Sequence, residues 1–111
     1  MNTNIKTQFV EYFTKGIKPS NNLKIGVEQE KFLFEGETKK RITYKKLKEL
    51  FKNLEKNKWE PLLEKDNIIG LKRGKQQITT EPGLQCELSG EPLETIHKVC
   101  SESSNYLEEI K

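Results

Sequence analysis

Apolar residues recur at helical spacing in three stretches of the chain, so the sequence predicts three helices. The first spans residues 3–17 and ends at a run rich in Pro and Asn. The second starts at Thr43, whose hydroxyl suits an N-cap, and ends at Asn57 or Lys58. The third opens at residues 89–92, with Pro92 in its first turn. The side chains expected to be buried are Ile5, Phe9, Tyr12, Phe13 and Gly16 in the first helix, Tyr44, Leu47, Leu50, Phe51 and Leu54 in the second, and Leu93, Ile96, Cys100, Ser103, Ser104, Leu107 and Ile110 in the third.

Between these helices the polar and apolar residues alternate, which predicts short strands joined by tight turns. Pro61 indicates an edge strand, because proline cannot donate a ladder hydrogen bond. Runs of hairpin strands beside helices favour an α+β fold with a mainly antiparallel sheet flanked by helices. The extended segments are residues 23–34, 59–64, 68–72, 76–80 and 84–88.

The first of these segments carries two acids where a core-forming strand is expected. Glu28 and Glu30 share one strand face, about 6–7 Å apart, and Phe32 and Phe34 lie on the same face. Unpaired carboxylates there repel each other and resist burial. Either the face is solvated, or a divalent cation binds the two acids.

A second acidic stretch lies near residues 78–90. Glu81, Gln85 and Glu87 face one way if the backbone stays extended, whereas a bulge at Pro82 and Gly83 changes that alternation. Pairing of this stretch with the first acidic strand brings four carboxylates together. An oxygen-only set without histidine suits Mg²⁺ or Mn²⁺ and disfavours zinc. The simpler interpretation is a surface hairpin.

Two long blocks of sequence resemble a known family. "IGVEQEKFLF", followed by "WEPLLEKDNIIGLKRGKQQITTEPGLQCELSGEPLETIHKVC", is similar to the N-terminal part of glutamate–cysteine ligase, in its plant and proteobacterial branch. The resemblance covers most of residues 23–111. An isolated E-x-E is a weak signal, but the two blocks match in order and at the right separation. The chain departs from the usual family pattern at Gln29, Leu33, Leu84 and Cys86, none of which is an acid.

The resemblance implies a fold and a reaction. The fold is part of the carboxylate–amine ligase fold of glutamine synthetase, in which a curved antiparallel sheet holds metals and ATP. The reaction joins the γ-carboxyl group of L-glutamate to the amine of L-cysteine through a γ-glutamyl phosphate, the first step of glutathione biosynthesis. The metal-binding acids in that scheme are Glu28, Glu30, Glu81 and Glu87. The charge and location of Lys72 and Arg73 suggest that one of them meets a substrate carboxylate or phosphate group, and Gln85 is a further candidate for substrate binding.

The family's members are several times longer than 111 residues. We therefore expect residues 1–111 to be the N-terminal part of a single catalytic domain, inactive when isolated. A second chain that supplies the remainder of the ligase is one way to complete it. The resemblance leaves open which residues bind cysteine and which are catalytic.

Composition adds a rival interpretation. The net charge is +3, and lysines crowd residues 39–58, so the chain could be a small basic nucleic-acid-binding protein or a non-catalytic interaction module. Nucleic acid is disfavoured, since the aromatics of that stretch lie on the apolar stripe and no binding motif is present. His97, the two cysteines, Trp59 and Phe32 are expected to be structural. We find no apolar run of membrane-spanning length and no signal peptide, and we expect a cytoplasmic protein.

Overall fold

The computed structural model describes the backbone of residues 2–111 and the side chains of residues 4–111. It contains three α-helices and five strands, with two short 3-10 turns at Ser20–Asn22 and Glu55–Asn57. The elements are, in chain order, α1 (Asn2–Lys15), β1 (Glu28–Phe32), α2 (Tyr44–Leu54), β2 (Glu60–Glu64), β3 (Asn67–Arg73), β4 (Gln76–Glu81), β5 (Gln85–Ser89) and α3 (Ile96–Glu109). The predicted α+β class is confirmed.

The five strands form one antiparallel sheet in the order β1-β5-β4-β3-β2. Strands β2 to β5 follow one another as a meander, because each is joined to the next by a tight turn. Strand β1 then pairs with β5 at the far edge. The edge position predicted for Pro61 is confirmed, since β2 is the other edge strand.

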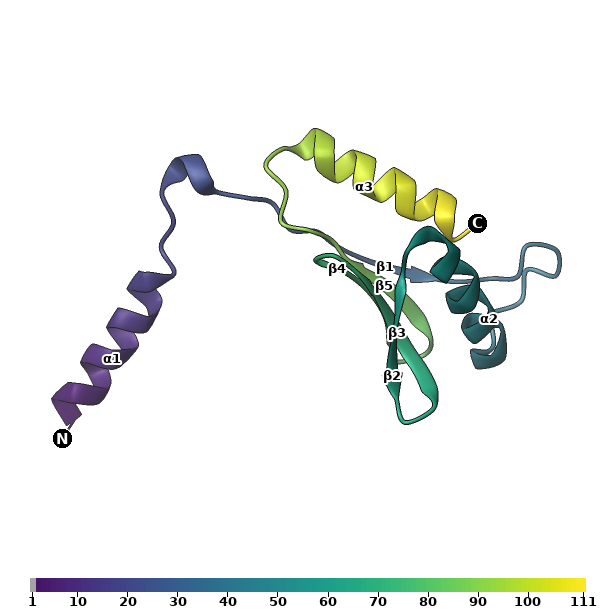
Figure 1. The fold of residues 1–111 in the computed structure, drawn as a ribbon, viewed down its shortest axis with the longest axis horizontal. Coiled ribbons are helices and arrows are strands. Elements are labelled where there is room, and N and C mark those ends of the chain that lie inside the picture. The colour runs from purple at the N-terminus through teal and green to yellow at the C-terminus, as the bar shows by residue number, and fades with distance from the viewer. Residues whose placement is uncertain (1) are drawn as a thin grey trace.

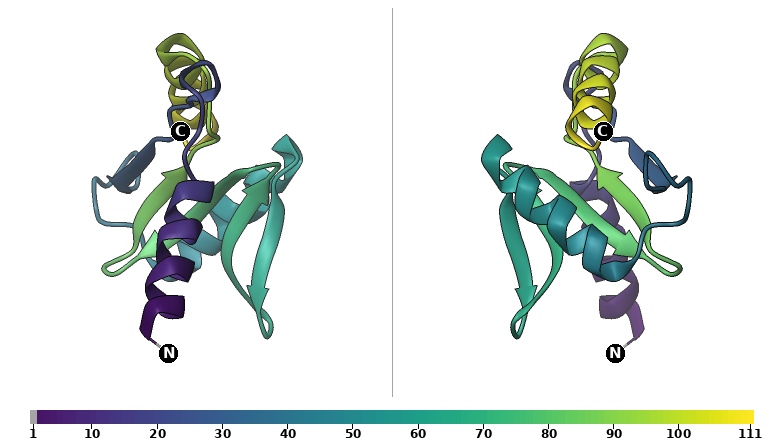
Figure 2. Two further views of the ribbon diagram at one scale, coloured as in Figure 1. Left: turned by 90° about the vertical axis from the view of Figure 1, so that its left-hand side faces the viewer. Right: turned by 90° about the vertical axis from the view of Figure 1, so that its right-hand side faces the viewer.

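Helices α2 and α3 cover the same face of the sheet. Figure 1 shows α3 above the curved sheet and α2 beside it, and Figure 2 shows the same arrangement from two further sides. Thr43 caps α2 as predicted, with its side-chain oxygen accepting from the Lys46 N–H at 3.3 Å. The core between helices and sheet consists of Leu47, Phe51, Leu54, Trp59, Ile68, Leu71, Ile78, Cys86, Leu88 and Tyr106.

The helix α1 forms where it was predicted but buries nothing. Figure 1 shows it apart from the rest of the molecule, at the end of an extended segment. Its apolar residues stay exposed, for example Phe9 at 62% and Tyr12 at 75%. The radius of gyration is 18.5 Å, against about 13 Å for a compact chain of this length. The prediction of a buried stripe on α1 is therefore wrong, because no other described element packs against it.

The third helix begins later than predicted. Each of its buried residues lies one position before a residue that was predicted to be buried. Thr95 is the N-cap and accepts from the Lys98 N–H at 3.3 Å, so Pro92 precedes the helix. Pro92 and Leu93 are held outside because Leu93 forms a β-bridge with Ile25. The buried residues are Val99, Glu102 and Tyr106. Ile96, Cys100 and Leu107, which were expected to be buried, are exposed.

The first strand is shorter than the alternation suggested. Only residues 28–32 form a continuous ladder, with single bridges at Ile25 and Phe34. Phe32 is 54% exposed, so its prediction as a core residue is wrong. Phe32 is exposed because its side chain lies on the face of the sheet that no helix covers.

Among the residues that the structure describes, no helix is long and apolar enough to cross a membrane. Cys86 is buried and Cys100 is exposed, and both are free thiols. The packing role predicted for the cysteines therefore holds for Cys86 alone.

Candidate metal and substrate site on the open face of the sheet

The strand register brings the predicted acids onto one face, opposite the helices. Glu30 pairs directly with Glu87, which in turn pairs with Thr79 on the next strand. Directly opposed residues on an antiparallel pair have Cβ atoms about 4.5–5.5 Å apart, so Glu30 and Glu87 are close neighbours. We call this side of the sheet, which no helix covers, the open face. The residues that share it are Glu28, Glu30 and Phe32 of β1, Gln85, Glu87 and Ser89 of β5, Gln77, Thr79 and Glu81 of β4, and Lys72 of β3.

The fourth acid, Glu81, reaches this face because the chain makes a turn after it. Residues 82–84 form a hairpin turn between β4 and β5, with Gly83 at φ 76° and Leu84 at φ 58°. Positive φ values let the chain reverse tightly. Glu81 is thereby paired with Gln85, so Glu81, Gln85 and Glu87 face the same way. The bulge considered from Pro82 and Gly83 does not form.

The four acids lack cationic partners. Within residues 4–111, the ion pairs of the structure involve none of Glu28, Glu30, Glu81 and Glu87. Glu87 accepts a hydrogen bond from the Ser89 hydroxyl at 3.0 Å. Glu28 and Glu30 are exposed, and Glu81 and Glu87 are half-buried. Negative charge on this face is thus left to solvent.

This donor set fits a hard divalent cation in its chemistry. Carboxylate oxygens, with hydroxyls of Thr79 and Ser89 beside them, are the ligands preferred by Mg²⁺ and Mn²⁺. As the side chains stand, no three acidic, histidine or cysteine residues in the described part of the chain are close enough to hold a metal. Because Glu30 and Glu87 are directly opposed, other rotamers of their side chains can direct both carboxylates toward one cation.

The structure separates the three residues suggested for substrate contact. Lys72 and Gln85 lie on the open face, Lys72 in an exposed ion pair with Glu60 at 3.4 Å. Arg73 lies on the helix-covered face. Its guanidinium stacks over Trp59 at 4.1 Å and pairs with Glu109 at 2.7 Å, which gives it a structural role.

Buried polar groups lie directly behind the acids. The Tyr106 hydroxyl donates to Cys86 Sγ at 3.4 Å, and Cys86 is next to Glu87 in β5. Burial raises the pKa of the Cys86 thiol, although the hydrogen bond from Tyr106 opposes this. Burial also raises the pKa of Tyr106. Both groups stay neutral at pH 7, so they add no charge beneath the open face.

A cavity of about 470 Å³ opens elsewhere, between the β3–β4 turn and α3. Its lining includes Arg73, His97 and Glu102 but none of the four acids. Glu102 is buried and accepts from the Gln76 side-chain amide at 2.7 Å and from the Glu91 N–H at 2.9 Å. This pocket therefore lies on the helix-covered side of the sheet. The hydrogen bonds of Glu102 join α3 to β4 and to the loop after β5, so we assign this acid a structural role.

Arg41 lies at the end of the open face, and no signal in the sequence predicted a separate role for it. Its guanidinium is 4.4 Å from the centre of the Phe32 ring. In the sequence Arg41 stands beside two lysines, and in the fold the pairing of Phe34 with Arg41 brings it to the sheet. Hairpin pairing of residues 34 and 41 was not readable from the periodicity.

The amino-acid sequence of the chain matches a known protein family. Residues 24–111 match the model of glutamate–cysteine ligase family 2 (GCS2). The chain is 45% identical over 107 residues to glutamate–cysteine ligase A, chloroplastic, of Oryza sativa subsp. japonica. It is 46% identical to the glutamate–cysteine ligase, chloroplastic, of Nicotiana tabacum and 43% identical to that of Arabidopsis thaliana, again over 107 residues.

These alignments take in 96% of the chain but only 20–22% of each relative. The chain thus spans about a fifth of the length of the curated relatives that it matches. The matched region contains both acidic strands and the whole sheet. The chain belongs to glutamate–cysteine ligase family 2.

Proposed function

We propose that this chain supplies the metal-binding part of an ATP-dependent ligase that joins the γ-carboxyl group of L-glutamate to the amine of L-cysteine. The observation that carries the proposal is the register of β1, β5 and β4, which gathers Glu28, Glu30, Glu81 and Glu87 on one open face in a member of this family. Unpaired acids on a curved sheet reduce stability, and a bound divalent cation offsets that cost.

In this proposal Glu30 and Glu87 hold Mg²⁺, or Mn²⁺ in its place, with Glu28 and Glu81 on either side. The cation would neutralise phosphate oxygens of ATP and polarise the phosphoryl group. The acids are held on strands of one sheet, which fixes the positions of their carboxylates. The Lys72 ammonium, on the strand beyond β4, supplies a positive charge for a carboxylate or phosphate group of the substrates.

The reaction has two steps in this scheme. A γ-carboxylate oxygen of glutamate takes the terminal phosphoryl group of ATP and ADP leaves. The amine of cysteine then attacks the activated carbonyl and displaces phosphate, with loss of a proton. Gln85, between Phe32 and Glu81 in the register, is placed to orient a polar group of glutamate.

We further propose that residues 1–111 form part of one catalytic domain and need the rest of that domain, on the same or a second polypeptide. The chain exposes 8602 Å², against about 6,300 Å² expected for a compact protein of 13.0 kDa. The exposed residues include the apolar side chains of α1 and Glu28 and Glu30 of the open face. A cytoplasmic location belongs to this proposal, whereas the names of the plant relatives describe those proteins as chloroplastic.

The direct test is an assay of the chain with ATP, Mg²⁺, glutamate and cysteine, alone and joined to the remaining part of a family member. We expect no dipeptide or ADP from the chain alone and restored turnover in the joined protein. Glu87→Gln in the joined protein should abolish turnover, whereas Glu108→Gln on the outside of α3 should not. Turnover by the chain alone, or full activity of Glu87→Gln, would overturn the proposal.

A further inference from the structure

The two arginines of the chain stack on aromatic rings in the same way but differ in their partners. Arg73 lies over Trp59 and is neutralised by Glu109 at 2.7 Å. Arg41 lies over Phe32 at 4.4 Å and within 5.7 Å of the centre of the Phe34 ring. No carboxylate among the described residues lies within ion-pair distance of Arg41. One arginine is thus satisfied internally and the other is not.

The position of Arg41 is fixed from two directions. The rings of Phe32 and Phe34 lie against its guanidinium, and one of its N–H groups donates to the carbonyl oxygen of Gly83 in the β4–β5 turn. A guanidinium has five N–H donors, and the structure assigns one of them to Gly83. Arg41 is exposed, so its remaining donors face solvent.

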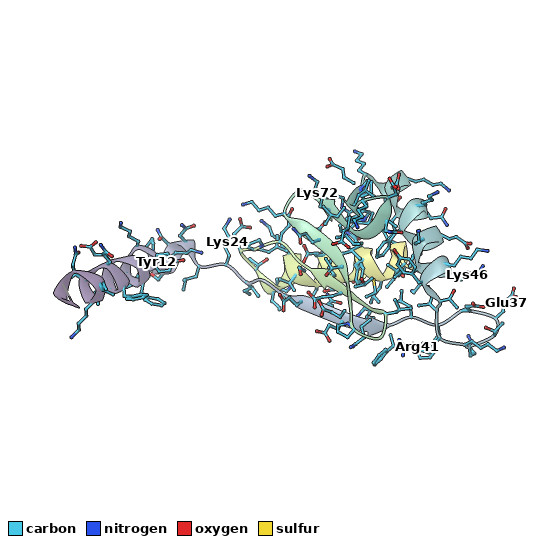
Figure 3. All side chains as sticks on the ribbon, turned by 90° about the horizontal axis from the view of Figure 1, so that it is seen from below. Tyr12, Lys24, Glu37, Arg41, Lys46 and Lys72 are labelled. Atoms are coloured by element: carbon cyan, nitrogen blue, oxygen red, sulfur yellow. The ribbon has the colours of Figure 1, made fainter. Side chains whose placement is uncertain are left out.

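This guanidinium lies at one end of the row of acids. Phe32 pairs with Gln85, and Gln85 pairs with Glu81, so the ring under Arg41 shares its row with an acid. Lys72 is on β3, beyond the opposite side of the same acids. Figure 3 shows the labelled Lys72 and Arg41 well apart, on either side of the strands that carry the acids. The acids are therefore bordered by a cation on each side.

A stacked guanidinium without a carboxylate partner is suited to bind planar or tetrahedral oxyanions in two-point fashion. From this arrangement we infer that Arg41 binds an oxyanion of a substrate, a carboxylate or a phosphoryl group, against the open face. The inference rests on the proposed function for the identity of the substrates. Its physical basis is separate: an anchored cation with unused donors beside acids that a bound metal would neutralise.

Chemical modification of the 111-residue chain tests this without any need for turnover. Phenylglyoxal reacts with accessible guanidinium groups, and mass spectrometry separates the peptides of Arg41 and Arg73. Arg41 should react severalfold faster than Arg73, which serves as the internal control. With Mg²⁺ present, L-glutamate, ATP and inorganic phosphate are added one at a time. Protection of Arg41 by glutamate identifies a carboxylate, and protection by ATP or phosphate identifies a phosphoryl group. Lack of protection by all three would overturn the inference.

Substitution separates binding from a structural role in the turn. In a titration followed by nuclear magnetic resonance, Arg41→Gln should weaken binding of the protecting anion about tenfold or more, because a charge-assisted hydrogen bond is lost. Arg41→Lys should recover part of that loss, and Lys6→Gln, an equal charge change on α1, should have no effect. If Arg41 only supports the turn, Arg41→Gln shifts the amide signals of residues 82–84 while the anion affinity stays unchanged, and the inference fails.

Failure of the inference about Arg41 can be distinguished from failure of the proposed function. Mn²⁺ binding by the chain in the absence of any anion depends on the acids and not on Arg41. Binding of Mn²⁺ with no anion protection of Arg41 contradicts the inference and leaves the metal site standing. Anion protection without Mn²⁺ binding supports the inference and contradicts the proposed metal site.

Discussion

The two faces of the sheet are built from alternate residues of the same strands, yet they follow opposite rules. On the covered face, Leu71, Ile78, Cys86 and Leu88 are fully buried under α2 and α3. On the open face, their immediate neighbours in sequence include Lys72, Thr79 and Glu87, and the acids among them have no cationic partners. One face supplies the stability of the fold, and the other carries charges that lower it.

This contrast explains why a chain with so few apolar residues folds. Only 32% of its residues are hydrophobic, but those that form the core lie together between the covered side of the sheet and helices α2 and α3. The open face then does not need to contribute to the core, and a metal-binding set can occupy it. The same reasoning applies to the arginines, one of which stabilises the covered side while the other remains available for an anion.

The largest expected effect comes from removing packing on the covered face. Leu88→Ala should lower the free energy of unfolding by about 2–5 kcal/mol, because it leaves a cavity in a filled core. Urea unfolding of the two variants Leu88→Ala and Glu87→Ala measures the contrast between adjacent residues. An equal loss in both would show that the two faces do not differ as described.

A smaller loss is expected at the one buried acid of α3. Glu102 accepts hydrogen bonds from the Gln76 side chain and the Glu91 N–H, so Glu102→Ala leaves both donors without their acceptor. The expected cost is about 1–3 kcal/mol of unfolding free energy. Glu108→Ala, on the exposed side of α3, is the matched control, and similar denaturant midpoints for the two variants would contradict the role of Glu102.

Alkaline pH should weaken the covered face. Burial raises the pKa of Cys86 above its ordinary value of 9.0. The unfolded thiol therefore loses its proton first as pH rises, so stability that is full below pH 9.0 falls as pH rises beyond it. The melting temperature of wild type and Cys86→Ala between pH 7 and 11 measures this, and the decline should be steeper in wild type. Cys100→Ala is the control, and equal slopes in wild type and Cys86→Ala would refute the assignment.

On the open face a substitution should raise stability. Glu30 and Glu87 are directly opposed, so Glu87→Gln removes repulsion between like charges and should stabilise the metal-free protein by about 0.2–1 kcal/mol. With Mg²⁺ the order should reverse, since wild type gains from binding and the variant does not. Destabilisation of the metal-free protein by Glu87→Gln would mean that this carboxylate makes a stabilising contact that outweighs the repulsion from Glu30, and would contradict the account of the open face.

The smallest effect is expected from α1. Its apolar side chains are exposed, so deletion of residues 1–17 should leave the thermal midpoint nearly unchanged while the helical circular dichroism signal falls. A large drop in the midpoint would show that α1 packs on the rest of the chain in solution.

Much of this arrangement is readable from the sequence, because it depends on local signals. The alternation in β3 and β4, the proline at the edge and the Thr43 cap each follow from nearby residues. Strand parity also predicted that Glu28 and Glu30 share a face, and that Glu87 faces the same way as Glu81 if no bulge intervenes.

The parts that were missed depend on tertiary contacts. The start of α3 is set by the bridge between Ile25 and Leu93, and its buried side includes a glutamate whose partners come from β4 and the loop after β5. Hydrophobicity alone predicts that Ile96 and Leu107 are buried and Glu102 is exposed, so it predicts the wrong buried side of α3. The role of Arg41 needs the pairing of residues 34 and 41 and the position of Gly83. The sequence of α1 has the apolar periodicity of a packed helix, but no other described element packs against its apolar side.

The most direct test of the central claim is Mn²⁺ binding to the 111-residue chain, measured by the loss of the free Mn²⁺ signal in electron paramagnetic resonance. Wild type should bind Mn²⁺, and excess Mg²⁺ should displace it. The double variant Glu30→Gln/Glu87→Gln should lose binding, while Glu55→Gln/Glu108→Gln, with the same charge change off the open face, should keep it. Binding that is absent in wild type, or equal in all three proteins, would contradict a metal site on the open face.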